Sequence, residues 1–368
     1  MRGMLTCLLI VVLSAVPSQA QLRDVLRRAA RRAEQRSKQV PSQPDAGQEV
    51  PVTLLPPPET LTDGDAYPLY QQAAKLLPGD AVIQLGLEWP QRKPGQLPLD
   101  RARRLVRQCQ GTLEMIEKAT LCRSCTWPAP AIKSGLASRL KGEFEVNRDF
   151  PALLHLKTSL AIAENRPGDA IKTFQTALAL ARHLGTGPGL MSPSMAVAAA
   201  DLTCSNIPAY VELSDAPILY EALAALPKPF IDVEKAGQAE IASATDNRQI
   251  VEANRPAYLE QLNIGLASAR QAAKRLDRTV AALQCLEAIR QYTQDHDGAL
   301  PQTLDEIKVS IPQDVLNAKP FEYTCTGTQA VLRSPRPEGE KTKIGLRLEI
   351  SASKSDQGVR FTVNRVVE

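Results

Sequence analysis

Aromatic residues are scarce in this sequence, at 4% of the chain. A core without them must be aliphatic and rich in Ala and Leu, which favours helices over strands. An excess of one charge is also lacking, because the formal net charge of +4 is too small to indicate a nucleic-acid-binding protein. Apolar residues make up 43% and charged residues 23%, close to globular averages, which excludes a wholly disordered or polytopic membrane protein.

Histidine is nearly absent, with only His155, His183 and His296 in the chain. No two of them have the His-x-x-x-His spacing, so no local segment supplies two histidine ligands for a zinc ion. The Gly-x-Ser-x-Gly turn of hydrolases and the Gly-rich loops that hold phosphates are also missing. A favourable interaction with a helix dipole explains His183 at the end of a helix. We predict no metal and no cofactor, and we favour a protein that is not an enzyme.

The N-terminus carries the most specific signal in the sequence. Arg2 precedes an apolar run over residues 5–16, and small residues follow Pro17. This arrangement is typical of a secretory signal peptide, since the run is shorter than the about 20 residues that span a bilayer. We predict a signal peptide over residues 1–20 and an exported protein, either periplasmic or secreted. The basic residues that follow the cleavage point resist translocation, so an uncleaved membrane anchor is the alternative.

Residues 21–60 are predicted to form a basic arm and a Pro-rich linker. In residues 22–38, Arg alternates with apolar residues at helical spacing, which leaves open peripheral membrane contact, docking on a partner, or a solvated arm. The Pro-rich residues 39–60 cannot bury enough apolar surface to fold alone.

Residues 61–255 are predicted to form a helical domain, in which Asp65 caps a first short helix. The clearest unit covers residues 149–184, where Asp149 is placed as an N-cap and a turn at residues 165–169 joins two helices. The second helix has Phe174 on its buried face and carries Ala-x-x-x-Phe-x-x-Ala, part of the tetratricopeptide pattern. No second copy follows at the repeat spacing, so we favour a generic antiparallel helix pair.

Residues 256–368 are predicted to form a small α+β module. A long helix covers residues 258–294, and short strand patterns follow at residues 321–325 and 330–333. Apolar and polar residues then alternate over 344–350 and 359–363, which predicts a hairpin with one buried face. The predicted fold is therefore mainly α, with a helical-hairpin (TPR-like) N-terminal region followed by an α+β module of one long helix and a few antiparallel strands.

Two segments of the chain resemble known families. Cys-Thr-Trp at residues 125–127, Gly-Asp-Ala at 168–170 and Leu-Ala-Arg-His-Leu at 180–184 resemble a pattern in secreted proteins of unassigned function from planctomycete-type bacteria. Residues 292–323, with Leu-Pro at 300–301 and Lys-Pro-Phe at 319–321, are similar to the segment after the long helix of type II secretion pseudopilins. Val315 and Ala318 stand where that pattern has Pro and Gly. The resemblance implies a shared helix-then-sheet module and brings no known activity.

Cysteine pairing follows from the predicted export, because exported proteins form disulfides in an oxidising compartment. Cys122 and Cys125 form a Cys-x-x-Cys motif after a helix, which favours a structural disulfide or core thiols over a redox site. In a pseudopilin-like module the first strand returns across the long helix. That arrangement implies a bridge between Cys285 on the helix and Cys325 on the strand, with a buried thiol as the alternative.

These observations predict an exported binding or scaffolding protein that presents grooves between packed helices to a protein partner in the cell envelope. One alternative is a cell-envelope hydrolase whose site is assembled from distant residues; another is a membrane-surface protein held by residues 22–38. Glu143 and Glu145 lie in a polar stretch and are explained by a solvated face rather than by a glycosidase site. A deep polar cleft with a strongly shifted carboxylate or His would favour the hydrolase, and grooves without such groups would favour binding.

Overall fold

A computed structural model describes most of the chain after residue 50, namely residues 51–81, 93–128, 148–213, 215–246, 255–335, 346–355 and 358–367. The predicted signal peptide, the basic arm, and the pair Glu143 and Glu145 lie outside the described residues. Val52–Glu368 forms one compact unit. Within the described ranges, no helix combines the length and the apolar character that crossing a bilayer requires.

The first helices form a packed group. Helix α2 (Ala66–Leu76) packs against α5 (Gln110–Thr120), and α4 (Leu99–Gln108) leads into α5. Asp65 caps α2 as predicted, because its Oδ1 accepts a hydrogen bond of 3.1 Å from the Tyr67 amide. Strands β1 (Thr62–Asp65) and β2 (Cys122–Ser124) pair in parallel, which ties the start of α2 to the end of α5. The sequence did not predict this small sheet.

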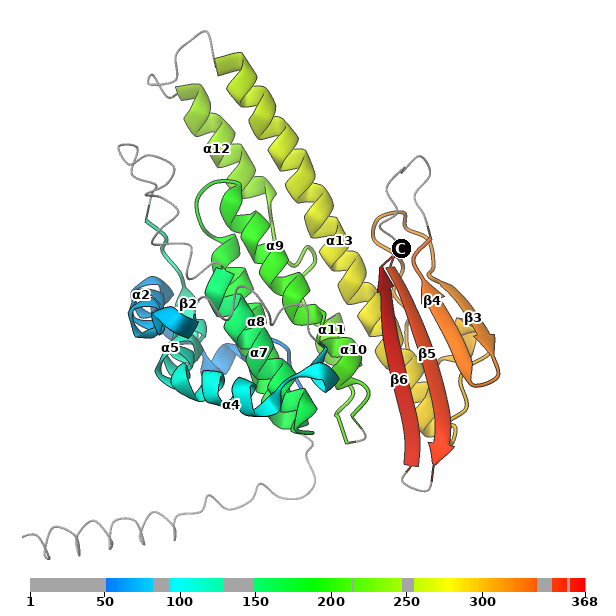
Figure 1. The fold of residues 1–368 in the computed structure, drawn as a ribbon. Helices are drawn as coiled ribbons and strands as arrows, with labels where there is room; N and C mark the ends of the chain where they lie inside the picture. Colours follow the sequence, from blue (N-terminus) through cyan, green and yellow to red (C-terminus); the bar gives the residue numbers. More distant parts are fainter. Residues whose placement is uncertain are drawn as a thin grey trace, which may run out of the picture. The chain divides into compact units, whose positions relative to one another are not determined.

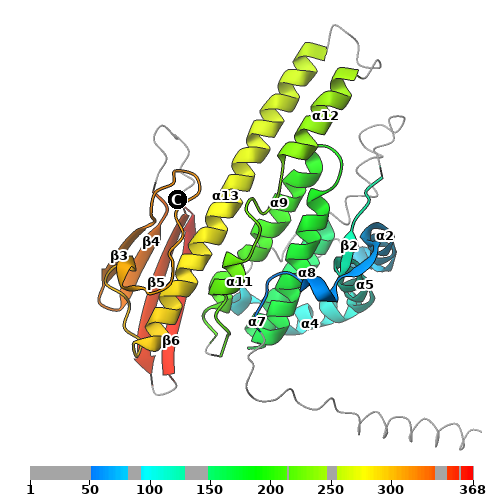
Figure 2. The same ribbon diagram turned by 180° about the vertical axis from the view of Figure 1, so that it is seen from behind.

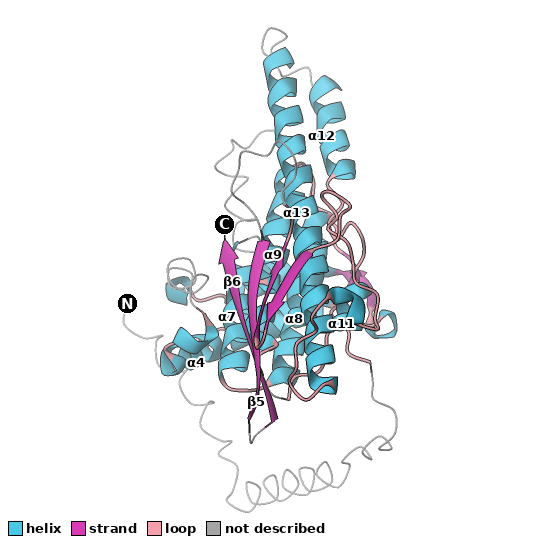
Figure 3. Ribbon diagram, turned by 90° about the vertical axis from the view of Figure 1, so that its right-hand side faces the viewer, coloured by secondary structure: helices cyan, strands magenta, loops and turns pink. Residues whose placement is uncertain are grey.

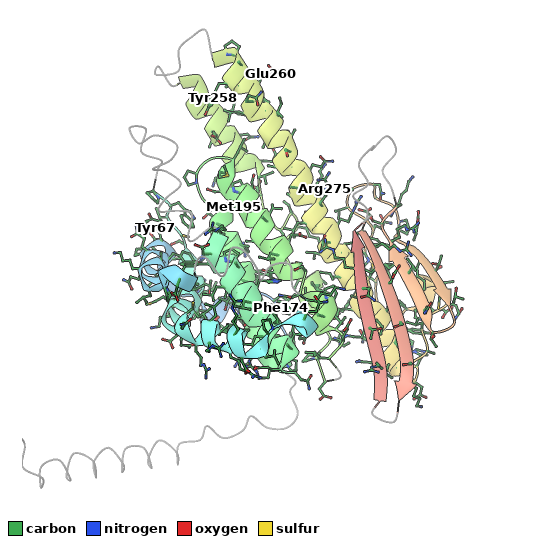
Figure 4. All side chains as sticks on the ribbon, viewed as in Figure 1. Tyr67, Phe174, Met195, Tyr258, Glu260 and Arg275 are labelled. Atoms are coloured by element: carbon green, nitrogen blue, oxygen red, sulfur yellow. The ribbon has the colours of Figure 1, made fainter. Side chains whose placement is uncertain are left out.

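The predicted helical hairpin is confirmed. Helices α7 (Phe150–Ala163) and α8 (Pro167–Gly185) pack side by side, and α9 (Met191–Cys204) packs against α8. The turn between α7 and α8 uses Asn165 at a φ of 53°, a left-handed conformation that Asn tolerates. Phe174 is fully buried and meets the ring of Tyr210 edge-on at 5.7 Å between centroids, and it lies among the central helices (Figure 4).

The start of α7 differs from the prediction. Asp149 makes no capping hydrogen bond, and its own backbone is helical. An N-cap needs a non-helical backbone to aim its side chain at the first free amides, so Asp149 cannot act as one. Its buried carboxylate instead accepts a hydrogen bond of 2.7 Å from the Arg148 guanidinium.

The folded unit begins earlier than the predicted boundary at residue 61. Leu54 is only 1% exposed. The Gln175 side-chain amide on α8 donates to both the carbonyl and the hydroxyl oxygen of Thr53, each at 2.9 Å. The reason is the aliphatic sequence from Val52 to Leu55, which supplies apolar area that the surrounding prolines do not. We call residues 52–57 the docked segment.

Helix α12 (Glu234–Asp246), which the sequence analysis did not predict, packs against the first half of α13 (Arg255–Asp295). The two helices lie side by side in both ribbon views (Figures 1 and 2). Gly237 permits their close approach, because a Cβ at that position would clash with Leu266 of α13. Helix α13 also contacts α9 and α11 (Tyr220–Ala224), and the prediction of one long helix is confirmed.

The C-terminal strands form one antiparallel sheet in the order β3-β4-β5-β6 (Figure 1), and Figure 3 shows strands in magenta, with β5 and β6 labelled. Its strands are β3 (Glu322–Thr326), β4 (Gln329–Arg333), β5 (Leu346–Ser355) and β6 (Gly358–Val367). Leu348, Ile350 and Phe361 are buried on one face, as the alternating pattern predicted. A mainly helical fold with a C-terminal α+β part is therefore confirmed.

Two buried ion pairs anchor loops to α13. Arg278 pairs with Asp314 at 3.0 Å, and Arg290 pairs with Glu287 at 2.7 Å, with all four side chains 5% exposed or less. The Arg290 guanidinium also donates to both carbonyls of residues 216–217. Because a buried charge needs a partner and further hydrogen bonds, these groups hold the loops before α11 and after α13 in place.

The outer edge of strand β6 faces the helical part of the unit. The Val363 amide donates to the Glu212 carboxylate at 2.8 Å, and Arg365 lies 3.7 Å from Asp201. An edge strand presents unpaired amides that can pair with another chain. Here a glutamate satisfies one of these amides and links the sheet to the helices.

Candidate functional site

A cleft of about 680 Å³ opens between α5 and the α7–α8 hairpin. Apolar residues that line it include Val106 of α4, Leu121 after α5, and Leu160 of α7. Pro56 and Pro57, at the end of the docked segment, also line it. Apart from Ala161, the remaining lining groups are amides, hydroxyls and charged side chains. This volume and this mixture of apolar and convergent polar groups are typical of ligand sites.

The charges of the cleft are mostly paired. Lys157 of α7 reaches across to Glu117 of α5, with 2.5 Å between Nζ and Oε1. Arg166 pairs with Asp169 in the first turn of α8. Lys172 is exposed and has no acidic partner among the described residues. The cleft therefore keeps one cation available to a ligand.

An ion-pair network holds the α7–α8 turn beside the cleft. Glu164 accepts hydrogen bonds from Arg103 of α4 and from Arg166. Burial acts to raise the pKa of the Glu164 carboxyl, but these guanidinium groups together hold it below its ordinary value. Arg103 also pairs with Asp100 at 3.0 Å. The network joins α4 to the hairpin and so fixes the helices that line the cleft.

The sequence analysis did not identify these cleft residues, although a local signal was available. Lys157 is the one charged residue in α7, whose remaining residues are almost all buried. On α8, Asp169, Lys172, Thr173 and Thr176 follow the helical spacing i, i+3, i+4 and i+7 and all line the cleft. A polar stripe on a helix usually faces solvent, so the sequence alone did not separate a cleft wall from a surface.

Of the two alternatives for Cys122 and Cys125, the structure has thiols rather than a disulfide, because both cysteines are free and the described cysteines do not come within disulfide distance. Cys122 begins strand β2, and Cys125 follows the end of that strand. Burial, and then the nearby Asp65 and Cys122, raise the pKa of the Cys125 thiol to about 12. A thiol of that pKa is not a nucleophile at neutral pH, so this motif is structural.

His183 connects the end of α8 to the segment that contains Cys122 and Trp127. Its Nε2 lies 3.1 Å from the Cys122 carbonyl and its Nδ1 lies 2.9 Å from the Tyr70 hydroxyl. A carbonyl can only accept, so Nε2 carries the proton and Nδ1 accepts from Tyr70. The Trp127 indole donates to the His183 carbonyl at 2.7 Å. The segments around residues 125–127 and 180–184 therefore pack against each other.

The dipole interpretation of His183 is wrong. Burial lowers the pKa of the imidazole to about 4, despite the hydrogen bond to Cys122. A neutral ring has no favourable charge interaction with the end of a helix. The ring of Trp127 stacks on the ring of the buried Tyr70, with 6.2 Å between their centroids. These two rings enclose the part of the core in which His183 lies.

A second polar group, formed by two residues of α7 and one just after α9, contains residue types that hydrolases use. Ser159 donates to the Asn206 side chain at 3.0 Å, and the His155 ring lies 3.0 Å from the same amide. All three side chains are 5% exposed or less, and burial lowers the pKa of His155 to about 4. No substrate reaches a buried group of this kind, so the three residues are a hydrogen-bonded part of the core.

The predicted bridge between Cys285 and Cys325 is wrong, because the described cysteines do not come within disulfide distance. Cys285 is fully buried on α13, with its Sγ 3.8 Å from the Pro312 carbonyl. Cys325 lies on β3, with its Sγ 3.8 Å from the Gly327 carbonyl. Burial raises the pKa of the Cys285 thiol, consistent with a core thiol.

The described residues contain no group of three or more His, Cys, Asp or Glu side chains placed to hold a metal ion. Comparison of the chain with protein-family models, with curated proteins and with solved structures found no match. The functional argument therefore depends on the chemistry of the cleft.

Proposed function

We propose that the protein is an exported binding protein that acts without catalysis, and that the cleft between α5 and the α7–α8 hairpin holds its ligand. The observation that carries this proposal is the cleft itself, with about 680 Å³ of space between apolar and polar walls. The export rests on the signal-like residues 1–20. The ligand would belong to a partner in the cell envelope.

The composition of the cleft favours binding over hydrolysis. Within the described part of the chain, its lining contains no His, Cys or Ser side chain. Its two carboxylates, Glu117 and Asp169, are each engaged in an ion pair. A hydrolase needs a nucleophile or a general base in reach of its substrate, and neither the buried His155 nor the half-buried His183 lines this cleft.

A cleft-filling variant tests the proposal. Gln110 is exposed at the start of α5 and lines the cleft, so Gln110→Trp places an indole in the opening. Lys118→Trp adds the same side chain at an exposed position of α5 outside the lining and serves as the matched control. The full chain and both variants are screened by thermal unfolding against amino acids, short peptides, sugars, nucleotides and fatty acids.

A ligand that binds only the folded state adds about 2.7 kcal/mol to the free energy of unfolding at a concentration of a hundred times its Kd. The unfolding temperature rises as a result. We expect at least one compound class to stabilise the wild type and Lys118→Trp but not Gln110→Trp. Stabilisation that persists in Gln110→Trp would place the ligand elsewhere. A screen in which no compound class stabilises the wild type would contradict the binding function of this cleft.

A further inference from the structure

The docked segment is a peptide that the helices already recognise in cis. Residues 52–57 have no helix or strand of their own, yet Gln175 binds the main-chain carbonyl of Thr53 and Leu54 is buried. The segment ends at Pro56 and Pro57, which line the cleft. The surface of α8 thus binds an irregular, aliphatic stretch of chain through an amide-to-main-chain contact, and the open cleft continues from the end of that stretch.

The polar groups of the cleft complement a second peptide. Thr120, Thr173 and Thr176 donate their hydroxyl hydrogens to carbonyls of their own helices. Their oxygen lone pairs remain as acceptors for peptide N–H groups. The Gln110 amide and the Lys157 ammonium supply donors for peptide carbonyls.

A peptide carries one donor and one acceptor per residue, so it can satisfy groups of both kinds. An acyl chain has neither along its length. It would bury the same hydroxyls and amides without new partners, which costs free energy for every group left unpaired. The mixed lining therefore favours a peptide over a lipid tail.

The charge of the cleft selects among peptides. Lys157 and Arg166 are neutralised by Glu117 and Asp169, whereas Lys172 is not paired with any described acidic group. Helix α4, which contributes Val106 to the lining, adds exposed Arg104 and Arg107. The lining itself carries three cations and two carboxylates, and this excess of positive charge attracts an acidic group.

We infer that the ligand of this cleft is an irregular or extended peptide segment with aliphatic residues and an acidic side chain, whose carboxylate pairs with Lys172. This inference rests on the proposed binding function and names its ligand class. The peptide would follow the docked segment beyond Pro57, with its main chain between the α5 and α8 walls.

The test begins with a displayed library of random heptapeptides, panned against the immobilised full chain and counter-selected against Gln110→Trp. Enriched peptides are synthesised with their acidic residue intact, changed to the amide, or changed to Lys. Their affinities are measured for the wild type, for Lys172→Met, and for Lys75→Met. Lys75 is an exposed lysine in the last turn of α2 and does not line the cleft, so its variant is the matched control.

We expect acidic peptides to be enriched, and we expect Lys172→Met to weaken them about fivefold, the upper end for an exposed ion pair. Lys75→Met should leave their affinity unchanged, and Lys172→Met should not weaken the amide versions. Enrichment of basic peptides, or equal weakening by both lysine variants, would overturn the inference. Dodecanoate is tested in parallel: cleft-dependent binding of dodecanoate without any enriched peptide would overturn the peptide class while leaving the binding function in place.

Discussion

The α7–α8 hairpin and α13 place their charged residues in opposite ways. Around the hairpin, Lys157 and Lys172 remain at an open cleft, where water and a ligand can reach them. On α13, Arg278, Glu287 and Arg290 are buried and bind loop groups. A charged group that is buried by its own fold uses its hydrogen bonds to hold other parts of the protein. A charged group at a cleft can still form hydrogen bonds to a ligand. Exposure therefore separates the candidate binding groups from the structural ones.

The largest effect should come from breaking a buried pair. Arg290→Met leaves Glu287 buried without its cation, which should lower the free energy of unfolding by about 3–5 kcal/mol in chemical denaturation. Adding Glu287→Leu removes the orphaned charge and should recover most of the loss. Arg270→Met on the same helix breaks an exposed pair with Glu234 and should cost far less. Equal losses in Arg290→Met and Arg270→Met would show that burial does not distinguish the two pairs.

A comparable loss in the helical hairpin should have a different cause. Phe174 is fully buried against Tyr210, so Phe174→Ala should lower the free energy of unfolding by about 3–5 kcal/mol through the cavity it leaves. Phe174→Leu retains most of the apolar volume and should cost less. Unlike the loss in Arg290→Met, the loss in Phe174→Ala should not be recovered by a second substitution that removes a contacting side chain. The same denaturation experiment checks it, and a loss under about 1 kcal/mol would contradict the burial of Phe174.

The two desolvated histidines, His155 and His183, should make stability fall in mild acid. The pKa of His183 is about 4 in the folded protein, against an ordinary value of 6.5, so the unfolded chain binds more protons between these values. Each such histidine contributes stability that is complete above about pH 6.5 and is lost as pH falls towards 4, by about 1.4 kcal/mol per pH unit.

The fully buried Glu287 and the surface residue Glu212 act in the opposite direction, because desolvation raises the pKa values of both carboxyls. The measurement is therefore the difference between the wild type and His183→Gln, in denaturation series from pH 7 to pH 4.5. We expect the free energy of unfolding of His183→Gln to fall less steeply with decreasing pH than that of the wild type, by the contribution of one histidine. Parallel curves over this range would mean that His183 is protonated in the folded protein.

The smallest effect should come from one backbone position after α13. Ala318 has a φ of 53°, in the left-handed region where glycine is favoured. Ala318→Gly should therefore stabilise the protein by about 0.5–1 kcal/mol. Ala267→Gly, at an exposed position within α13, should instead destabilise it by about 1 kcal/mol. Thermal unfolding of both variants checks the signs, and destabilisation by Ala318→Gly would contradict the left-handed geometry.

Local patterns were sufficient for much of the fold. Phe174 and its helical spacing predicted the buried side of α8, and the alternation around Ile350 predicted the β5–β6 hairpin, because side-chain period is a direct consequence of backbone geometry. Asp65 was recognisable as a cap for the same local reason. Helix α12 was missed, since its close packing depends on Gly237, a residue that disfavours helices when read alone.

The candidate site was beyond the reach of the sequence alone. Glu117 and Lys157 come together from α5 and α7, and only the packing of those helices brings them into contact. The thiols of Cys285 and Cys325 show the converse, because the packing of α13 and the sheet does not bring them within disulfide distance. Such placements depend on the arrangement of whole elements, which local periodicity does not encode.

By itself, the sequence determined the mainly helical character, the α7–α8 hairpin and the long helix with its antiparallel strands, because each follows from apolar spacing within one segment. Only the tertiary structure decided which charged residues are buried and which line a cleft. Lys172 and Arg290 both occur in helices rich in apolar residues, yet one is exposed at the cleft and the other is enclosed by a loop more than 70 positions away in the chain. The difference lies in what packs over each side chain, and packing between distant segments is settled only when the whole chain folds.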